Sequence, residues 1–438
     1  MIVMKFGGTS VGSPQQIQKV SKIVASQLDQ NPLIVVSALS GVTNLLVELS
    51  HAKEKAPILK NLLERHETVL AELNLDKNLL HTEFEELQSL MSGVELLQEC
   101  TQRTQDRILS FGEHCSSKIL AAFLNQTLDK PVKAICSYEL GLRTDSRFGK
   151  ATPLDESKEN ILYNVKNHAQ EIIVTTGFIA KDLQDNLTTL GRGGSDFSAA
   201  YIGAAIGATE IQIWTDVSGM MTADPKIVEN VKHVESLSFE EASELAYYGA
   251  KVLHPSTMIP AIEKNIPVRI LNTNFPDHPG TFIYKDTQKS KSVVKAIAHR
   301  DGLTVINITT PRMLNQHGFL AKIFDVFRDH KVSVDMVSTS EISVSLTISD
   351  HDPIAAIVQD LHAFSKVTVE KGLSVVSVVG EGVREDQNIP ARVFTVLQKE
   401  NIPVRMISLG ASKINLSFLV DSEFVKKSVK GLHQAFFV

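Results

Sequence analysis

The chain begins with the stretch MIVMKFGGTSVG (residues 1–12), and this stretch decides the fold class. An apolar run containing Lys5 leads directly into Gly7 and Gly8, so a short buried strand delivers a cation and a glycine turn to one place. A helix start follows at Ser13-Pro14, a capping residue with proline at the first helical position. A strand, a glycine turn and a helix N-terminus are typical of a phosphate site, although an ordinary strand-to-helix turn has the same pattern.

The first two thirds of the chain alternates between strand-like and helix-like segments. Most of the expected strands are continuous apolar runs, as in parallel strands covered on both faces. They lie at residues 2–6, 33–37, 132–135, 172–176, 211–215 and 268–272, with helical patterns between them, for example at 195–206 and 239–248. The sequence therefore predicts an α/β fold with an open, mostly parallel sheet sandwiched by helices, whose function lies at the carboxyl ends of the strands.

Two further segments set the expected domain limits. Residues 51–110 are charged, rich in Leu and Glu, and helical in spacing, which predicts a helical insertion that serves as a lid or a subunit contact. Residues 284–292 are polar and charged, which predicts a linker. A first domain is thus expected at 1–285 and a second region at 286–438.

The second region contains an internal repeat. Residues 318–327 (GFLAKIFDVF) match residues 388–397 (NIPARVFTVL). Each copy is expected to run strand, helix, strand, strand, helix, and in the first copy these lie at 303–308, 319–329, 332–338, 342–348 and 353–364. Two copies are too few for a solenoid, so we expect α+β units at 300–371 and 372–438 that pair side by side.

The bulk composition excludes several classes of protein. The 438 residues carry a net charge of −6 and no block of Lys or Arg, which gives no support to nucleic-acid binding. Cys100, Cys115 and Cys136 are an odd number without CxxC spacing, which is typical of reduced thiols in a cytoplasmic protein. No apolar run is long enough to span a membrane, and the apolar start is too short for a signal peptide. We expect a soluble, cytoplasmic protein with no membrane or nucleic-acid partner.

A second glycine cluster, GRGGSD at residues 191–196, precedes an alanine-rich helix. It is interpreted either as a loop with a Ser or Asp cap, or as an anion-binding helix N-terminus in which the Arg192 fork suits a carboxylate. Neither glycine cluster fits GxxxxGK[ST], and neither fits GxGxxG after a strand. Two glycine turns of this type in one α/β domain favour a phosphate-binding fold that is neither a P-loop nor a dinucleotide-binding fold.

Seven motifs occur in the order typical of aspartokinases, which belong to the amino acid kinase family. They are MKFGGTSVG, VVSALSGVTNLL (35–46), SFGEHCSS (110–117), TTGFIA (175–180), GRGGSDFSAA (191–200), WTDVSGMMTADPKIV (214–228) and YGAKVLHPSTM (248–258). The tail resembles the paired ferredoxin-like ACT domains of those enzymes. The resemblance implies transfer of the ATP γ-phosphoryl group to the β-carboxylate of L-aspartate. The product, L-4-aspartyl phosphate, leads to lysine and diaminopimelate, threonine and methionine.

The resemblance also implies catalytic roles. A carboxylate with a pKa of about 4 is already ionised at neutral pH, so no general base is needed and catalysis reduces to positioning and charge neutralisation. Lys5, with the backbone amides of Gly7 and Gly8, would stabilise the transferring phosphoryl group. Asp196 would orient the lysine.

Substrate roles follow from the same resemblance. Arg192 would bind a carboxylate of aspartate and Glu113 its α-ammonium group, while Gly194 and hydroxyls would complete the aspartate site; the hydroxyls are those of Ser37, Thr43 and Ser195. Without the resemblance, Glu113 reads as a solvated helix residue.

The nucleotide set would comprise Lys5, Gly8, Thr215, Asp216, Met221, Asp224, Lys226 and Lys251. Thr215 and Asp216 would meet adenine and ribose, and Asp224, Lys226 and Lys251 the ribose and phosphates. Met221 stands where related enzymes often carry tyrosine, and Lys226 where they often carry arginine, so stacking and bidentate phosphate contact are expected to be weaker. Magnesium is implied by the chemistry and is expected to be held mainly by ATP oxygens, without a dedicated carboxylate cage.

The first repeat resembles that of lysine-inhibited aspartokinases. Its candidate effector residues are Met313, Gln316, Gly318, Phe319, Ser333, Val334, Asp335, Thr339, Ser340 and Glu341. In the second repeat Arg405 replaces the acid at Asp335, so only the first copy is expected to bind an effector with an ammonium group. We expect L-lysine as an allosteric inhibitor and a homodimer or tetramer formed through the ACT domains. The alternative is that both repeats are purely structural dimerisation units.

Two other functions stay open on the residues. One is a different amino acid kinase, acting on glutamate, carbamate or a nucleotide. The other is an amino-acid sensor without catalysis, against which the retention of Lys5, Arg192 and Asp196 together speaks. A fused homoserine dehydrogenase is not expected, because no residues follow the repeats.

Overall fold

The first sheet contains all six strands that the sequence predicts. In the computed structural model, which describes residues 1–249, 253, 255–285, 293–313, 317–409 and 414–438, the strand order is β3-β5-β2-β1-β8-β10-β11-β9. The strands are β1 (Ile2–Phe6), β2 (Pro32–Val36), β3 (Val132–Ile135), β5 (Ile172–Thr176), β8 (Ile211–Thr215), β9 (Ser236–Ser238), β10 (Val268–Asn272) and β11 (Thr281–Tyr284). Neighbouring strands are parallel except β10 and β11, which confirms the open, mostly parallel sheet.

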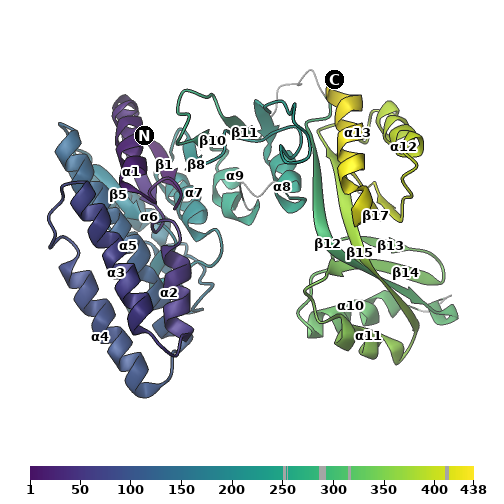
Figure 1. Cartoon of the computed structure of the whole chain (residues 1–438), viewed down its shortest axis with the longest axis horizontal. Helices are drawn as coiled ribbons and strands as arrows, with labels where there is room; N and C mark the ends of the chain where they lie inside the picture. Colours follow the sequence, from purple (N-terminus) through teal and green to yellow (C-terminus); the bar gives the residue numbers. More distant parts are fainter. Residues whose placement is uncertain (250–252, 254, 286–292, 314–316, 410–413) are drawn as a thin grey trace. The chain divides into compact units, whose positions relative to one another are not determined.

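Helices cover both faces of this sheet (Figure 1). On one face, α5 (Gln102–Thr127) contacts β2, β3 and β5 and is joined by α1 (Pro14–Ala25) and α2 (Val42–His51). On the other face, α7 (Gly194–Ile206) contacts β1, β2 and β8 and is joined by α6 (Ser157–Asn167) and α9 (Ile259–Glu263). The Ser13 side chain accepts a hydrogen bond from the amide of Gln16 with Pro14 at the first helical position, so the predicted cap of α1 is confirmed.

The alternation of side chains along β1 fixes where its lysine lies. Ile2, Met4 and Phe6 belong to the apolar core that also contains residues of α1 and α5. Successive side chains of a strand point to opposite faces, so Lys5 lies on the α7 side of the sheet. Lys5 is thereby placed next to α7, the helix that follows the second glycine cluster.

The predicted insertion consists mainly of α3 (Ala56–Glu72) and α4 (His81–Leu97). Leu62 and Val69 of α3, with Leu87 and Met91 of α4, are buried in the same core as β1. Helices that contribute buried side chains to a domain core do not move freely. The expectation of a lid therefore does not fit the packing, and these helices enlarge the core.

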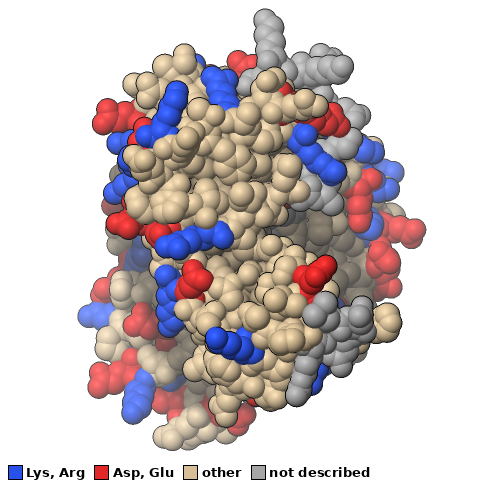
Figure 2. Space-filling view, turned by 90° about the vertical axis from the view of Figure 1, so that its right-hand side faces the viewer, with Lys and Arg blue, Asp and Glu red and all other residues tan. Residues whose placement is uncertain are grey.

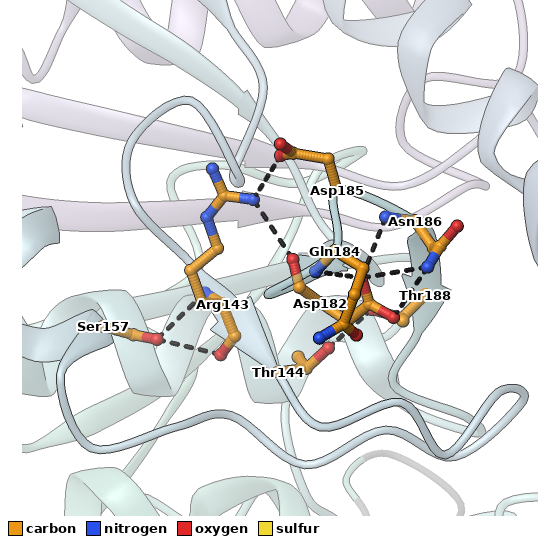
Figure 3. A network of polar contacts seen from close by, with 8 residues as sticks. All are labelled: Arg143, Thr144, Ser157, Asp182, Gln184, Asp185, Asn186 and Thr188. Carbon is orange, nitrogen blue, oxygen red and sulfur yellow. Dashed lines mark hydrogen bonds and ion pairs between the residues drawn. The ribbon is translucent and has the colours of Figure 1, made fainter.

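A small three-stranded sheet, which the sequence analysis does not predict, lies in the same unit. It has the order β4-β6-β7 and consists of β4 (Arg143–Thr144), β6 (Ile179–Asp182) and β7 (Leu187–Thr189). Strands β6 and β7 form an antiparallel hairpin in which Ile179 pairs with Thr189. The turn end of the hairpin is held by Asp182, whose carboxylate accepts hydrogen bonds from Gln184 and Asn186 (Figure 3). It also accepts one from the Ser146 hydroxyl.

The two repeats form one continuous sheet. Its order is β13-β14-β12-β15-β17-β16, and the strands are β12 (Ala296–Thr309), β13 (Val337–Thr339), β14 (Ser343–Ser349), β15 (Lys366–Val379), β16 (Met406–Ser408) and β17 (Asn415–Asp421). The helices of this part are α10 (Phe319–Asp329), α11 (Ile354–His362), α12 (Asn388–Lys399) and α13 (Val425–Phe437). The expected side-by-side pairing is confirmed by the antiparallel pairing of β12 with β15.

The two central strands of this six-stranded sheet, β12 and β15, each contribute to both repeats. Residues 303–309 of β12 pair with β14 of the first copy, whereas residues 296–300 pair with 375–379 of β15, which also pairs with β17. The first copy is thus continuous with the second through 14-residue strands (Figure 1). The sequence pattern predicts only the half of β12 that starts at Leu303.

The chain divides into two compact units that do not follow the sequence order. The first unit comprises Met1–Met220, Glu235–Phe239 and Val252–Thr287, and the second Met221–Val234, Glu240–Lys251 and Gln288–Val438. The second unit therefore contains α8 (Phe239–Tyr247) almost entirely. Ala223, Ile227 and Val228 share a core with strands and helices of the second repeat.

Surface charge and helix hydropathy fit the composition. Figure 2 shows basic and acidic side chains interspersed on one face, without a large area of one sign. In the part of the chain that the structure describes, no helix is both long enough and apolar enough to cross a membrane.

Candidate active site

An ion pair joins the two glycine clusters. The Nζ atom of Lys5 lies 2.5 Å from Oδ1 of Asp196, and both side chains are mostly buried. Asp196 stands in the first turn of α7, where the helix dipole also favours a negative charge. The sequence analysis predicts this contact, which connects residues 191 positions apart, and the structure brings the two residues together.

The turn after β1 is tightly built around its glycines. The Gly7 amide donates a hydrogen bond to the Trp214 carbonyl at 3.1 Å, so this amide is committed to β8. Of the two glycine amides predicted to bind the phosphoryl group, the Gly7 amide thus already has a partner within the protein. A Cβ atom at Gly8 would lie 2.9 Å from the Ala38 carbonyl oxygen, so the close approach of these two backbones requires glycine.

Glu113 is a buried acid beside the lysine. Its Oε1 atom accepts a hydrogen bond from the Ala38 amide at 3.0 Å, and Oε2 is buried without a hydrogen-bond partner among the described residues. Burial raises the pKa of Glu113 to about 8, while the Ala38 hydrogen bond and the charge of Lys5 act in the opposite direction. A buried acceptor without a partner is costly, so Oε2 is suited to receive a cationic group of a ligand.

The second glycine cluster begins α7 at a crowded point. Gly193 caps the helix in the left-handed region with a φ of 73°. The buried Ser195 packs closely against Gly177, so that a Cβ atom added to Gly177 would lie 2.6 Å from the Ser195 Cβ. A Cβ atom at Gly194 would lie 2.8 Å from the Phe178 ring. Phe178 itself has a φ of 63°. Sequence reasoning missed the part that Gly177 and Phe178 play, although TTGFIA contains both.

Arg192 differs from its neighbours because its side chain is exposed. No hydrogen bond or ion pair joins its guanidinium group to any other residue in the described ranges. The group is therefore available to an anionic ligand at the start of α7.

The remaining residues of the first unit lie at strand ends or the start of a helix. Ser37 directly follows β2, and its carbonyl accepts a hydrogen bond from Ser116 at 2.8 Å. Thr43 stands half-buried in the first turn of α2. Thr215 ends β8, and its hydroxyl donates to the carboxylate of the exposed Asp216 at 3.0 Å.

Ser10 and Thr273 tie these strand ends together, and sequence reasoning missed both. The Ser10 hydroxyl lies 2.7 Å from the Thr273 hydroxyl and 3.2 Å from the Trp214 carbonyl oxygen. The turn after β1 is thereby joined to the ends of β8 and β10. Parallel strands meet at their carboxyl ends, where a ligand binds in folds of this class.

Comparison with known proteins supplies the family. The sequence model of the amino acid kinase family matches residues 1–272, and that of the ACT domain matches residues 306–363 and 376–436. Aspartokinase 1, chloroplastic, of Arabidopsis thaliana is 38% identical over 99% of this chain and 80% of its own length. Lysine-sensitive aspartokinase 3 of Escherichia coli is 34% identical over 100% of this chain and 99% of its own. The chain belongs to the aspartokinase family.

Solved aspartokinase structures show the same fold. E. coli aspartokinase III in complex with aspartate and ADP has a TM-score of 0.84 and 33% identity, and covers 100% of both chains. The same enzyme in complex with lysine and aspartate also has a TM-score of 0.84, with 32% identity over 100% of both chains. The amino acid kinase fold followed by ACT domains, expected from the sequence, is confirmed.

Three of the predicted nucleotide residues of this aspartokinase lie in its second compact unit. Met221 is half-buried in an isolated bridge with His233. Asp224 accepts a hydrogen bond from the Lys226 amide at 2.8 Å, and the Lys226 side chain is exposed. Lys251 lies outside the described residues.

The predicted effector residues lie before and after α10 and around β13 of the first ACT repeat. Gly318 caps α10 with a φ of 79°, and the side chain of Phe319 is buried against Phe364 in the core. Met313 is half-buried at the end of a short 3₁₀ turn and Val334 is half-buried, whereas several polar members are exposed: Ser333, Thr339, Ser340 and Glu341. Gln316 lies outside the described residues. The side chain of Phe319 is thus part of the core, which leaves its backbone at the start of α10 for the predicted effector contact.

Asp335 already has cationic and hydroxyl partners. Its Oδ2 atom lies 3.1 Å from a guanidinium nitrogen of Arg300, and its Oδ1 atom accepts a hydrogen bond from the Tyr247 hydroxyl. Burial, followed by the Asp335 contact, raises the pKa of Tyr247, so this phenol stays protonated and donates. A ligand ammonium group at Asp335 would compete with both partners.

Proposed function

We propose that this aspartokinase transfers the γ-phosphoryl group of ATP to the β-carboxylate of L-aspartate. The observation that carries the proposal is the Lys5–Asp196 ion pair beside the unpartnered Oε2 atom of buried Glu113. A lysine suits the phosphoryl group, and a buried carboxyl oxygen suits the α-ammonium of an amino acid. The complex of E. coli aspartokinase III with aspartate and ADP supports the same pair of ligands.

The reaction needs charge neutralisation more than proton transfer. A β-carboxylate oxygen forms a bond to the γ-phosphorus while the bond from that phosphorus to the bridging oxygen breaks, and ADP leaves. Lys5 would neutralise charge on the phosphoryl oxygens, and Asp196 holds the lysine in place. Arg192 would bind an aspartate carboxylate, with Ser37, Thr43, Gly194 and Ser195 around it.

Magnesium would reach this site with the nucleotide. Among the described residues, no group of three or more His, Cys, Asp or Glu side chains could hold a metal ion, and Asp196 is already paired with Lys5. These residues fit a magnesium ion carried by ATP oxygens, which would neutralise phosphate charge.

The proposal is tested by an ATP-dependent hydroxamate assay with L-aspartate, D-aspartate and L-glutamate. We expect aspartyl hydroxamate from L-aspartate alone. Glutamyl hydroxamate in its place would favour the alternative of another amino acid kinase. Folded protein that forms no hydroxamate would support the alternative of a sensor without catalysis.

The raised pKa of Glu113 predicts a pH-dependent affinity for aspartate. Protonated Glu113 cannot pair with an ammonium group, and its pKa is about 8. We expect kcat/KM for aspartate to rise by about 20- to 30-fold between pH 6.5 and 8.5, the increase in the ionised fraction of a single group whose pKa is about 8. The Glu113→Gln variant should lose this rise, with a KM for aspartate that exceeds that of wild type at pH 8.5 and approaches it at pH 6.5. A profile that is the same for wild type and variant would contradict the assignment.

The same group predicts a change in stability with pH when no ligand is bound. The pKa of Glu113 is raised from 4.5 to about 8 in the folded protein. Its contribution to the free energy of unfolding is therefore fully present below pH 4.5 and is lost as the pH rises through about 8. Between pH 6 and 9, thermal unfolding should show a larger fall in Tm for wild type than for Glu113→Gln. Saturating aspartate should reduce that difference.

We further propose that L-lysine inhibits the enzyme through the first ACT repeat. E. coli aspartokinase III has been solved with lysine and aspartate bound, and the acid at Asp335 suits an ammonium group. The second repeat carries Arg405 at the equivalent place, paired with Asp421 at 3.0 Å. A homodimer or tetramer formed through the ACT sheet is part of this proposal. The three free cysteines suit a reducing compartment such as the cytoplasm.

The contact between Tyr247 and Asp335 predicts the direction of one change in lysine sensitivity. In Tyr247→Phe the carboxylate loses a competing donor, so lysine should inhibit at a concentration about three- to tenfold lower. Tyr248→Phe, at the residue directly after α8, is the control, because the Tyr248 hydroxyl bonds to Ser417 instead. Lysine titrations of the kinase activity make the comparison. Unchanged or weaker inhibition of Tyr247→Phe would contradict the prediction.

A further inference from the structure

Asp106 is a buried carboxylate that the mechanism above does not use. It stands on α5 with 1% of its surface exposed. Its Oδ2 atom accepts hydrogen bonds from the amides of Gly149 and Thr189, both at 2.9 Å. Its Oδ1 atom accepts a third from the Thr189 hydroxyl at 2.9 Å. The Asp106 side chain thus holds two distant segments of the chain, one at Gly149 and the other at Thr189, which lie 43 and 83 residues further along.

The two segments held by Asp106 form the base of the loop that carries Arg192. Thr189 ends β7, three residues before the arginine, and its carbonyl accepts a hydrogen bond from the Ala151 amide at 2.8 Å. Gly191 has a φ of 76°, and a Cβ atom there would lie 3.2 Å from the Gly149 carbonyl oxygen. The loop therefore starts from a fixed backbone, although the Arg192 side chain is exposed and has no partner among the described residues.

We propose that Asp106 is a positioning residue for aspartate binding, because it fixes the backbone from which Arg192 reaches the substrate carboxylate. This inference rests on the proposed role of Arg192. Asp106 itself is covered by α5, β7 and the loop at 145–152 and acts through that loop. A small displacement of a substrate-binding group is enough to lower the rate by about 100-fold.

Asp182 provides a matched control on the same hairpin. It is also 1% exposed and accepts a hydrogen bond from Ser146. Its contacts with Gln184 and Asn186, however, hold the turn between β6 and β7 (Figure 3). Asp106 holds the opposite end, at Thr189, next to the arginine loop. Removal of either carboxylate should weaken the hairpin, and only the removal of Asp106 should affect aspartate binding selectively.

The decisive variants are Asp106→Ala and Asp106→Asn in the full-length chain. The alanine leaves two buried amides without an acceptor, so we expect KM for aspartate to rise about 10- to 100-fold with KM for ATP within about twofold. The asparagine should rescue most of the loss, because its amide oxygen can accept both backbone amides while its NH₂ group donates to the Thr189 hydroxyl. Asp182→Ala should lower Tm and leave both KM values within about twofold.

A double variant shows whether Asp106 acts through the arginine. In an Arg192→Ala background, Asp106→Ala should raise KM for aspartate by less than about threefold further, since coupled residues are not additive. An additive rise, or equal rises in KM for aspartate and ATP, would overturn the inference. If Asp106→Ala does not fold, Thr189→Val replaces it, with an expected rise of about two- to tenfold for aspartate alone, and no rise would again overturn the inference. If instead Arg192→Ala leaves KM for aspartate unchanged, the proposed role of Arg192 fails.

Discussion

We expect the Lys5→Ala variant to lower kcat by about 100- to 1,000-fold, the loss that follows when one charged donor to the transition state is removed. Lys5 lies 2.5 Å from Asp196 and is mostly buried, so the variant also leaves an acid without its cation. KM for aspartate should change much less, because the proposed contact of the lysine is with the phosphoryl group. Steady-state kinetics with both substrates measure the difference.

Lys226→Ala is the comparison for Lys5→Ala. Lys226 is exposed, and its proposed contact is with the nucleotide. This variant should raise KM for ATP by about tenfold or less and keep kcat within about threefold. Asp196→Asn should reproduce part of the Lys5→Ala loss, since it removes the charge that orients the lysine. Equal losses of kcat in Lys5→Ala and Lys226→Ala would refute the roles given to both.

Arg192→Ala should raise KM for aspartate by roughly 100-fold, because two charge-assisted hydrogen bonds of about 1.5 kcal/mol each are lost. Its guanidinium group has no protein partner among the described residues, so Tm should stay unchanged. Arg192→Lys should recover little, since an ammonium group cannot reproduce bidentate binding. Substrate titrations at saturating ATP measure the effect. A KM within threefold of wild type would contradict a carboxylate-binding arginine.

The large sheet could be predicted from sequence because its strands carry a local signal. Each of the six is a short apolar run, and β1 adds the glycine pair that ends it. The sheet of β4, β6 and β7 has strands of two to four residues, too short for a periodic pattern. That sheet leads into Arg192, so the support of the arginine loop could not be derived from the loop's own residues.

In the candidate site, too, some contacts can be predicted from local motifs, whereas others depend on residues that are distant in the sequence. The Lys5–Asp196 pair is expected from the resemblance to aspartokinases, whose motifs include both glycine clusters. The burial of Glu113 does not follow from its neighbours, because it depends on the Ala38 backbone, 75 residues earlier. The sequence predicts Asp335 as an effector-binding carboxylate. It does not predict the partners Arg300 and Tyr247, because they lie in distant segments and belong to no recognisable motif.

The mixed membership of the second compact unit has a consequence for fragments of this enzyme. A fragment that ends at residue 285 would contain Ala223, Ile227 and Val228 without Val294, Ile297 and the other apolar residues that cover them. The exposed apolar surface would favour aggregation or local unfolding of Met221–Val234, the segment that carries Asp224 and Lys226. Proteolytic removal of the ACT repeats should therefore inactivate the kinase, and should not release a desensitised catalytic core.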